Sequence, residues 1–397
     1  MISLDNLTVS YGGWTLFDNI SFLINPKDRI GLVGRNGAGK TLLTDILREK
    51  YALKEGEILF AGNGRLSEQI RSIAFKDIYS LVDCKNTYYQ QRWHSTETDD
   101  VPTVFETLQQ HTDAHAIESL FNKFGIADLL PKKVIFLSSG ELRKFLIVKT
   151  LLSNPRILIL DNPFIGLDAP SRELLNDTLK QMAAMSGLQI ILLLSNPSDI
   201  PDMITHILPV QNKRLLPAIV RNNDQQETGI LSELFSVHEK MPQLPLKEAH
   251  PATHRVTLRL ENINIRYGNR TILKDLNWEI KADEKWALLG PNGAGKSTLL
   301  SLVYADNPQS YANTFYLFDR KRGSGESIWE IKKRIGYVSP EMHLYYMENV
   351  PCIDIVGSGF FDSIGLYCKC NEAQREQAMQ WMQVFGIASL AERSFLT

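Results

Sequence analysis

Long apolar runs are absent from this sequence of 397 residues. No stretch approaches the ~18 apolar residues of a membrane-spanning helix, and the N-terminus has neither the basic segment nor the apolar core of a secretory signal. Only 4 cysteines are present, too few for a disulfide framework, and Cys352, Cys368 and Cys370 lack the paired spacing of a zinc site. Neither charge sign dominates, since 43 Lys and Arg oppose 45 Asp and Glu, which argues against bulk binding to nucleic acid or anionic membranes. We therefore expect a globular, cytoplasmic protein.

A duplicated segment organises the sequence. Residues 7–41 align without a gap on residues 263–297 at an offset of 256, and residues 124–127 recur as 385–388 at an offset of 261. One domain therefore occurs twice. We expect a first domain at 1–210, a linker at 211–254 with a short helix near 231–235, and a second domain at 255–397. Because Thr397 corresponds to Phe136, we expect the second domain to lack counterparts of residue 137 and everything after it.

Two glycine-rich octapeptides, at 34–41 and 290–297, fit the P-loop pattern G-x4-G-K-[ST]. Each follows an apolar stretch that predicts a strand (30–33 and 286–289) and precedes one that predicts a helix (42–47 and 298–303). In such a loop the backbone N–H groups cradle phosphates, the lysine reaches the β- and γ-phosphates, and the final hydroxyl binds Mg²⁺. The sequence therefore predicts two sites for ATP and Mg²⁺. The candidate residues are Gly34, Asn36, Gly37, Ala38, Gly39, Lys40 and Thr41 in the first loop, and Gly290, Asn292, Gly293, Ala294, Gly295, Lys296, Ser297 and Thr298 in the second.

Two tyrosines recur at one spacing from the loops. Tyr11 and Tyr267 each lie 23 residues before the first glycine of their P-loop. A strand tyrosine taken alone is more often a core residue, but the recurrence favours a ring that stacks on adenine.

Two short apolar runs, at 157–160 and 190–194, predict strands buried on both faces of a parallel sheet. The first run ends in Asp161, which is typical of a Walker B strand that follows a P-loop. Asp161 is therefore the candidate carboxylate for Mg²⁺, directly or through water. With Lys40 and Lys296 it belongs to the candidate catalytic residues.

A pentapeptide between the two motifs carries a family resemblance. Leu137, Ser138, Ser139, Gly140 and Glu141 precede a predicted helix at 142–152. Here the sequence resembles the ATP-binding cassette (ABC) ATPases, whose signature reads LSGGQ, and Asp168 lies in what resembles their D-loop. Trp286 and the segments 318–329 and 335–339 resemble the duplicated soluble ABC ATPases called molybdate-transport ATP-binding proteins or photorepair proteins.

The resemblance implies an α/β fold with tandem P-loop NTPase domains, each with a mostly parallel sheet core, a helical subdomain and an N-terminal antiparallel sheet. It implies hydrolysis of ATP to ADP and phosphate, with ATP held between the P-loop of one cassette and the signature of another. The second cassette would come from the same chain or from a homodimer. A membrane permease encoded elsewhere is a further implied partner, which would place the protein at the inner face of the membrane.

The first copy departs from the family at two positions. Asn162 stands where the family usually carries the glutamate that polarises the attacking water, and Asn196 stands at the position of the switch histidine. An amide can orient water but cannot accept its proton, so we expect weakened hydrolysis at the first site. The Q-loop is ambiguous between Asp83 and the pair at 90–91, and Pro340 stands at the expected position in the second copy.

Two other functions stay open. A ribosome-associated ABC translation factor would have a long basic linker, whereas residues 211–254 carry five basic and five acidic residues. A regulatory ATP-dependent switch with little hydrolysis is favoured by Asn162 and Asn196. The basic cluster at 320–322 is interpreted as a solvated turn, and ribosome or nucleic-acid binding is not expected.

Overall fold

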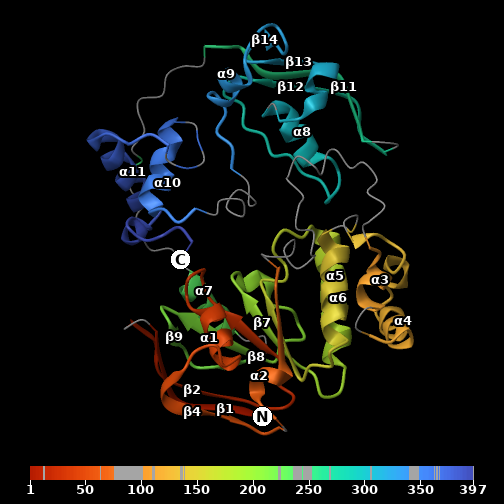
Figure 1. Cartoon of the computed structure of the whole chain (residues 1–397), viewed down its shortest axis with the longest axis vertical. Coiled ribbons are helices and arrows are strands. Elements are labelled where there is room, and N and C mark those ends of the chain that lie inside the picture. The colour runs from red at the N-terminus through yellow and green to blue at the C-terminus, as the bar shows by residue number, and fades with distance from the viewer. Residues whose placement is uncertain are drawn as a thin grey trace. The chain divides into compact units, whose positions relative to one another are not determined.

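The computed structural model describes residues 1–11, 14–62, 64–75, 102–109, 112–134, 137, 139–221, 225–235, 244, 253–267, 270–304, 306–338, 348–361, 363, 365 and 367–396. The chain divides into two compact units, Met1–Val237 and His238–Thr397, and each is described by itself (Figure 1). None of the helices in these ranges is long and apolar enough to cross a bilayer.

A mostly parallel sheet forms the core of the first unit. Its strand order is β10-β8-β3-β7-β6-β5, with β9 paired to β8. Every residue of β3, β6 and β7 is buried, which confirms the two predicted apolar strands. The strands are β3 (Ile30–Val33), β5 (Ile70–Ala74), β6 (Ile157–Asp161), β7 (Gln189–Leu194), β8 (His206–Gln211), β9 (Arg214–Leu215) and β10 (Ile219–Val220).

An antiparallel sheet of order β2-β1-β4 forms the second layer of this unit. Ile2 and Leu4 of its central strand are buried, and they pack in one cluster with Leu32 of β3 and Leu43 of helix α1 (Lys40–Leu47). Ile2 and Leu4 alternate with the half-buried Ser3 and Asp5, as the two-residue period of a strand predicts. The strands are β1 (Ile2–Tyr11), β2 (Trp14–Ile24) and β4 (Leu53–Phe60).

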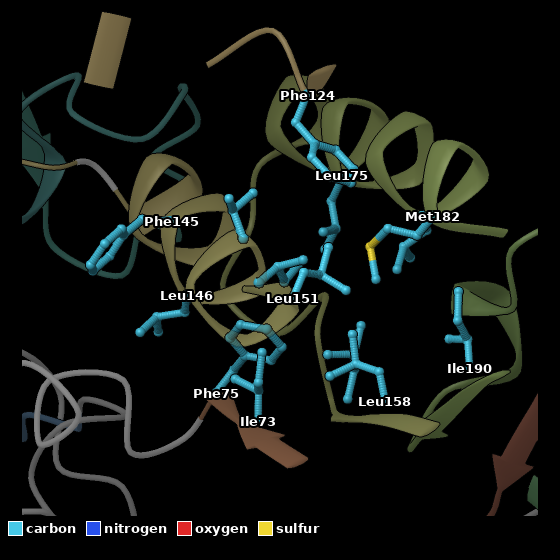
Figure 2. Close-up of a cluster of buried hydrophobic side chains, with 14 of the residues drawn as sticks. Ile73, Phe75, Phe124, Phe145, Leu146, Leu151, Leu158, Leu175, Met182 and Ile190 are labelled. Carbon is cyan, nitrogen blue, oxygen red and sulfur yellow. The ribbon is translucent and has the colours of Figure 1, made fainter. Parts of the chain in front are cut away.

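Helices cover the parallel sheet and share an apolar core with it. Figure 2 shows Leu146 and Leu151 of α5 and Leu175 and Met182 of α6 lying near Leu158 of β6 in this core. Full burial of each such side chain contributes roughly 2 kcal/mol, so the core holds both helices against the sheet. The helices are α1 (Lys40–Leu47), α2 (Leu66–Gln69), α3 (Val104–Gln109), α4 (Ala114–Lys123), η3 (Ala127–Leu129), α5 (Ser139–Leu151), α6 (Ala169–Ala183), η5 (Pro197–Asp199) and α7 (Gln225–Phe235).

The first unit continues past residue 210, where the sequence predicted a linker to begin. Strands β9 and β10 both pair with β8, and Leu231 and Leu234 of α7 are buried. The predicted short helix is the C-terminal part of α7. Strands of two residues show no sequence period, so they were invisible to pattern analysis.

The second unit contains a four-stranded antiparallel sheet of order β12-β11-β13-β14. Helix α8 packs on it through Leu299 and Leu302. A small separate core joins α10 and α11 through Ile353, Ala378 and Met382. The elements are β11 (Val256–Tyr267), β12 (Arg270–Lys281), α8 (Lys296–Val303), η6 (Pro308–Ala312), β13 (Thr314–Leu317), β14 (Arg320–Lys321), α9 (Ile328–Lys332), α10 (Cys352–Ser358), η8 (Gly359–Phe361), α11 (Glu372–Val384) and η9 (Ala388–Leu390).

The predicted strand at 286–289 is not formed. Residues 284–290 have no regular structure, and Trp286 and Leu289 are 57% and 87% exposed. The counterpart strand β3 is hydrogen-bonded on both sides, to β7 and β8, whereas no strand within the described residues pairs with 286–289. An apolar tetrapeptide without neighbouring strands cannot pair its backbone groups. Residues 335–338 likewise have no regular structure, and Val338 is 94% exposed.

The helical segment, in contrast, is repeated in both units. Val104 N donates to Lys132 O at 2.9 Å in the first unit, and Cys352 N donates to Arg393 O at 2.9 Å in the second. The isolated bridges Thr103–Lys133 and Pro351–Ser394 also correspond. The duplication therefore includes both the antiparallel sheet and the helical segment.

The basic cluster at 320–322 is only partly a solvated turn. Arg320 and Lys321 are exposed, but Arg322 is buried and pairs with Glu326 at 2.7 Å. The prediction of a solvated turn is wrong for Arg322. Its guanidinium pairs with a carboxylate four residues later, which offsets part of the cost of burying the charge.

Candidate functional site

Three strands of the first unit lead to the predicted site residues. Strand β3 enters the P-loop, β6 ends at Asp161, and β7 is followed by Ser195. Because β7 lies between β3 and β6 and all three are parallel, their carboxyl ends meet at one edge of the sheet. The strand order therefore assembles the site.

The first P-loop has a backbone that only glycine fits. A Cβ added to Gly34 would lie 2.2 Å from the Val210 carbonyl oxygen, and Gly37 and Gly39 have φ of +80° and +109°. Gly39 is the N-cap of α1. The loop therefore presents the unpaired N–H groups of a helix start, which suits phosphate.

The Lys40 side chain lies within its own loop. Its Nζ donates to Gly34 O at 2.6 Å and to Arg35 O at 3.0 Å, and the residue is 6% exposed. Burial lowers the pKa of Lys40, while the charge of Asp161 opposes that change. A phosphate at this loop would meet a buried ammonium group.

The structure brings together the two residues predicted to hold the metal. Thr41 Oγ1 donates to Asp161 Oδ2 at 3.0 Å, and Asp161 is buried at the end of β6. Mg²⁺ binds oxygen ligands and commonly uses one or two carboxylates together with substrate phosphates. This hydroxyl and carboxylate therefore fit Mg²⁺ held with ATP.

Asn162 is held by hydrogen bonds on both ends of its amide. Nδ2 donates to Asp161 Oδ1 at 3.0 Å, and Ser195 Oγ lies 2.8 Å from Asn162 Oδ1. Ser195 Oγ also lies 2.8 Å from Asn36 Oδ1 in the P-loop. Ser195 is thus a site residue that the sequence analysis did not identify, although its place directly after β7 was a usable signal.

Asn196, predicted at the switch-histidine position, makes local contacts. Its Oδ1 accepts from Ser198 N at 3.1 Å and from Ser198 Oγ at 2.8 Å. It is the N-cap of η5, a common role for asparagine. Contact with the P-loop comes from its neighbour Ser195.

Helix α5 begins at Ser139, three residues before the predicted start, so the last three residues of the signature pentapeptide lie in its first turn and Leu137 precedes the helix. Ser138 and the side chain of Ser139 lie outside the described residues. A Cβ on Gly140 would lie 3.3 Å from Ser171 Oγ, and Asp168 caps α6 by accepting from Ser171 N at 3.1 Å. The signature and the predicted D-loop residue of this unit therefore meet at the start of α6.

Glu141, where the family signature has glutamine, is paired with a cation. Lys132 Nζ lies 2.7 Å from Glu141 Oε1 and 3.4 Å from Asp128 Oδ2. The hydrogen bond with Glu141 is the main cause that raises the pKa of Lys132. The carboxylate charge at the signature is thus partly balanced within the same unit.

Arg143 ties α5 to the loop that follows Asn162. Its guanidinium donates to Pro163 O at 2.6 Å and to Ile165 O, and it lies 5.3 Å from the centre of the Phe75 ring. The residue is buried. This contact was not predictable from the sequence, in which Arg143 is only one of several polar residues within a predicted helix.

The second P-loop repeats the local geometry of the first. Lys296 Nζ donates to Gly290 O at 2.5 Å and to Pro291 O at 2.7 Å, and Gly293 and Gly295 have φ of +81° and +89°. Its other predicted residues behave less uniformly, since Asn292, Ala294 and Ser297 are exposed and Thr298 is buried.

The two predicted adenine-stacking tyrosines end corresponding strands. Tyr11 is the last residue of β1, but its side chain lies outside the described residues. Tyr267 ends β11, packs against the core of its unit, and its hydroxyl accepts from Asn307 Nδ2 at 2.9 Å. Burial raises the pKa of Tyr267. Adenine stacking by either ring stays a prediction, as do the Q-loop positions, which fall outside the described residues.

Comparison with known proteins decides the family. A family model for ABC transporters matches residues 17–165 and 273–396. The chain belongs to this family. The ABC transporter ATP-binding protein ModF of Escherichia coli (strain K12) is 35% identical to this ABC protein over 92% of the chain and 74% of its own length. An uncharacterized ABC transporter ATP-binding protein of Schizosaccharomyces pombe is 28% identical over 90% of this chain and 75% of its own length.

Among solved structures, cbiO1 from Clostridium perfringens, part of the ABC transporter complex cbiONQ, is 19% identical with a TM-score of 0.49, over 59% of this chain and 93% of that chain. The two-segment family match confirms the tandem P-loop fold and the ATPase class predicted from the sequence. This ABC ATPase carries its complete parallel sheet, in the described residues, in the first unit alone.

Proposed function

We propose that the first P-loop binds ATP with Mg²⁺. The observation that supports this best is the Thr41–Asp161 contact of 3.0 Å next to the buried Lys40. Lys40 would contact the β- and γ-phosphates, and Thr41 and Asp161 would hold the metal, which polarises the γ-phosphate when bound. The second P-loop would bind ATP in the same way through Lys296 and Ser297.

Fluorescence titration tests the binding proposal. An ATP analogue should bind more weakly to Lys40→Ala and to Lys296→Ala, and most weakly to the double variant, because each change removes a charge-assisted contact. Lys54→Ala, an exposed lysine on β4, is the matched control. Undiminished binding by the double variant would contradict the assignment of both P-loops.

We propose further that ATP binding closes a pair of cassettes and hydrolysis opens it, and that the protein energises transport. The second cassette would come from the same chain or from a second copy. The Escherichia coli relative at 35% identity is called an ABC transporter ATP-binding protein, which supports a transport-related role. The resemblance to molybdate-transport ATP-binding proteins makes molybdate the candidate substrate, with a permease as partner and a cytoplasmic location. Gene deletion should then lower molybdate uptake. Unchanged uptake would contradict the molybdate role and leave ATP binding intact.

A second function, an ATP-dependent switch with slow turnover, is favoured by one observation. The residue after Asp161 is an amide whose Nδ2 and Oδ1 both have hydrogen-bond partners, and an amide cannot accept a proton from the attacking water. Phosphate release and the lifetime of bound ATP distinguish the two functions. Slow phosphate release together with a long lifetime of bound ATP would support the switch, whereas rapid phosphate release would support the transport role.

A further inference from the structure

We propose that Ser195 is a positioning residue of the first nucleotide site, whose hydroxyl fixes the Asn162 amide so that Asn162 supports the metal-binding carboxylate of Asp161. The inference rests on the proposed binding of ATP and Mg²⁺ at the first P-loop.

Ser195 joins three segments of the site. It follows β7, while Asn162 follows β6 and Asn36 lies in the P-loop. Ser195 Oγ lies 2.8 Å from Asn162 Oδ1 and 2.8 Å from Asn36 Oδ1. The hydroxyl thus links residues that are 159 and 33 positions away in the chain.

The single proton of the Ser195 hydroxyl determines which atoms donate and which accept in these hydrogen bonds. A serine hydroxyl has one proton and cannot donate to two carbonyl oxygens. Asn162 must face the Asp161 carboxylate with its NH₂ group, so its Oδ1 faces Ser195 and accepts the hydroxyl proton. The Asn36 amide is then flipped by 180° about χ2, which exchanges its oxygen and nitrogen. In this orientation Asn36 Nδ2 donates to Ser195 Oγ.

Asp161 consequently receives a donor on each carboxylate oxygen. Asn162 Nδ2 lies 3.0 Å from Oδ1, and Thr41 Oγ1 lies 3.0 Å from Oδ2. Without the Ser195 hydroxyl the Asn162 amide would be free to turn, and Asp161 would lose a fixed donor. Residues that orient metal ligands influence metal affinity in this way. The effect should therefore depend on Mg²⁺.

Titration of a fluorescent ATP analogue into Lys296→Ala variants, with Mg²⁺ or with EDTA, isolates the first site. Ser195→Ala should weaken binding about three- to tenfold with Mg²⁺, the size expected for one hydrogen bond, and leave binding in EDTA unchanged. Ser195→Thr should keep wild-type binding because it retains the hydroxyl. Ser198→Ala is the matched control, since Ser198 lies three residues on and bonds Asn196.

A double-variant cycle tests whether Ser195 acts through Asn162. In an Asn162→Ala background, Ser195→Ala should cause no further loss. Equal binding by the Ser195→Ala and Ser198→Ala variants, or equal losses with and without Mg²⁺, would overturn the inference. If Ser195→Ala does not fold, Ser195→Cys must show the same Mg²⁺-selective loss. Lys40→Ala in the Lys296→Ala background tests the proposed ATP site separately from the role of Ser195. If that variant does not weaken binding, the P-loop assignment itself is contradicted.

Discussion

The two P-loops of this chain have one local geometry and two different surroundings. Lys40 and Lys296 each donate to the carbonyls of the first two residues of their own loop. The first loop follows a strand paired on both sides and contacts Asp161, 120 residues further along. The second follows residues without regular structure, and its lysine is more exposed. Eight residues therefore set the shape of the loop, whereas the strand and the carboxylate require distant segments.

The largest difference between the loops should be in metal dependence. Asp161→Ala should reduce the Mg²⁺-dependent affinity for ATP at the first loop about 100-fold, at the upper end of the losses seen when metal sites are altered. The second loop, measured in a Lys40→Ala background, should be unaffected. Titrations with Mg²⁺ and EDTA measure both, with Asp45→Ala of α1 as a carboxylate control. Equal losses at the two loops would mean that Asp161 has no specific role at the first.

A smaller effect should follow at the neighbouring position. Asn162→Glu supplies a proton acceptor and should raise phosphate release at the first site about 10-fold, in a protein paired with a cassette that carries a signature. Asn162→Gln is the neutral control of the same length. No gain from the glutamate would identify another residue as the limit on turnover.

Protein concentration should change turnover by a further, smaller factor. A polypeptide of these 397 residues carries one signature pentapeptide, at 137–141, so two first units would have to meet to complete a site. Phosphate release per mole of protein should rise about twofold for each doubling at low concentration, as mass action requires. Turnover per mole that does not change with concentration would show that single chains suffice.

The smallest effect concerns the acid stability of the second unit, which contains the Arg322–Glu326 pair. Burial opposes ionisation of Glu326, but hydrogen bonds from Arg322, Gly323 N and Ser324 outweigh it and lower its pKa from 4.5 to about 2. The pair therefore stabilises the fold above pH 4.5, and this stability is lost as pH falls toward 2.

Glu326→Gln should lower the thermal unfolding midpoint of the second unit by about 3 °C at pH 7. It should also remove most of the decrease in this midpoint that the wild-type protein shows between pH 5 and pH 3. Thermal unfolding followed by tryptophan fluorescence measures this, with the exposed Glu376→Gln of α11 as control. A variant with the wild-type pH profile would show that Glu326 does not determine the acid response.

The features that were predictable from sequence are local ones. The P-loops, the apolar strand that ends in Asp161 and the helix after the signature each depend on a few consecutive residues, and the structure forms all of them. The strand at 286–289 failed because an apolar run specifies a strand only where neighbouring strands pair with it.

Contacts between distant segments were beyond the reach of a single sequence. Ser195 directly follows an apolar strand, but its contact with Asn36, 159 residues away, leaves no mark in the local sequence. Strands β9 and β10 are each two residues long, too short to show a period. These elements depend on three-dimensional proximity, which no local pattern records.

The buried guanidinium of Arg143 has a mechanical consequence. It joins α5, which begins at the signature, to the carbonyls of Pro163 and Ile165 in the loop after Asn162. A displacement of that loop must either carry the helix with it or break hydrogen bonds of a buried cation, which is costly. Through Arg143, the position of the loop after Asn162 is thus coupled to the helix that begins at the signature.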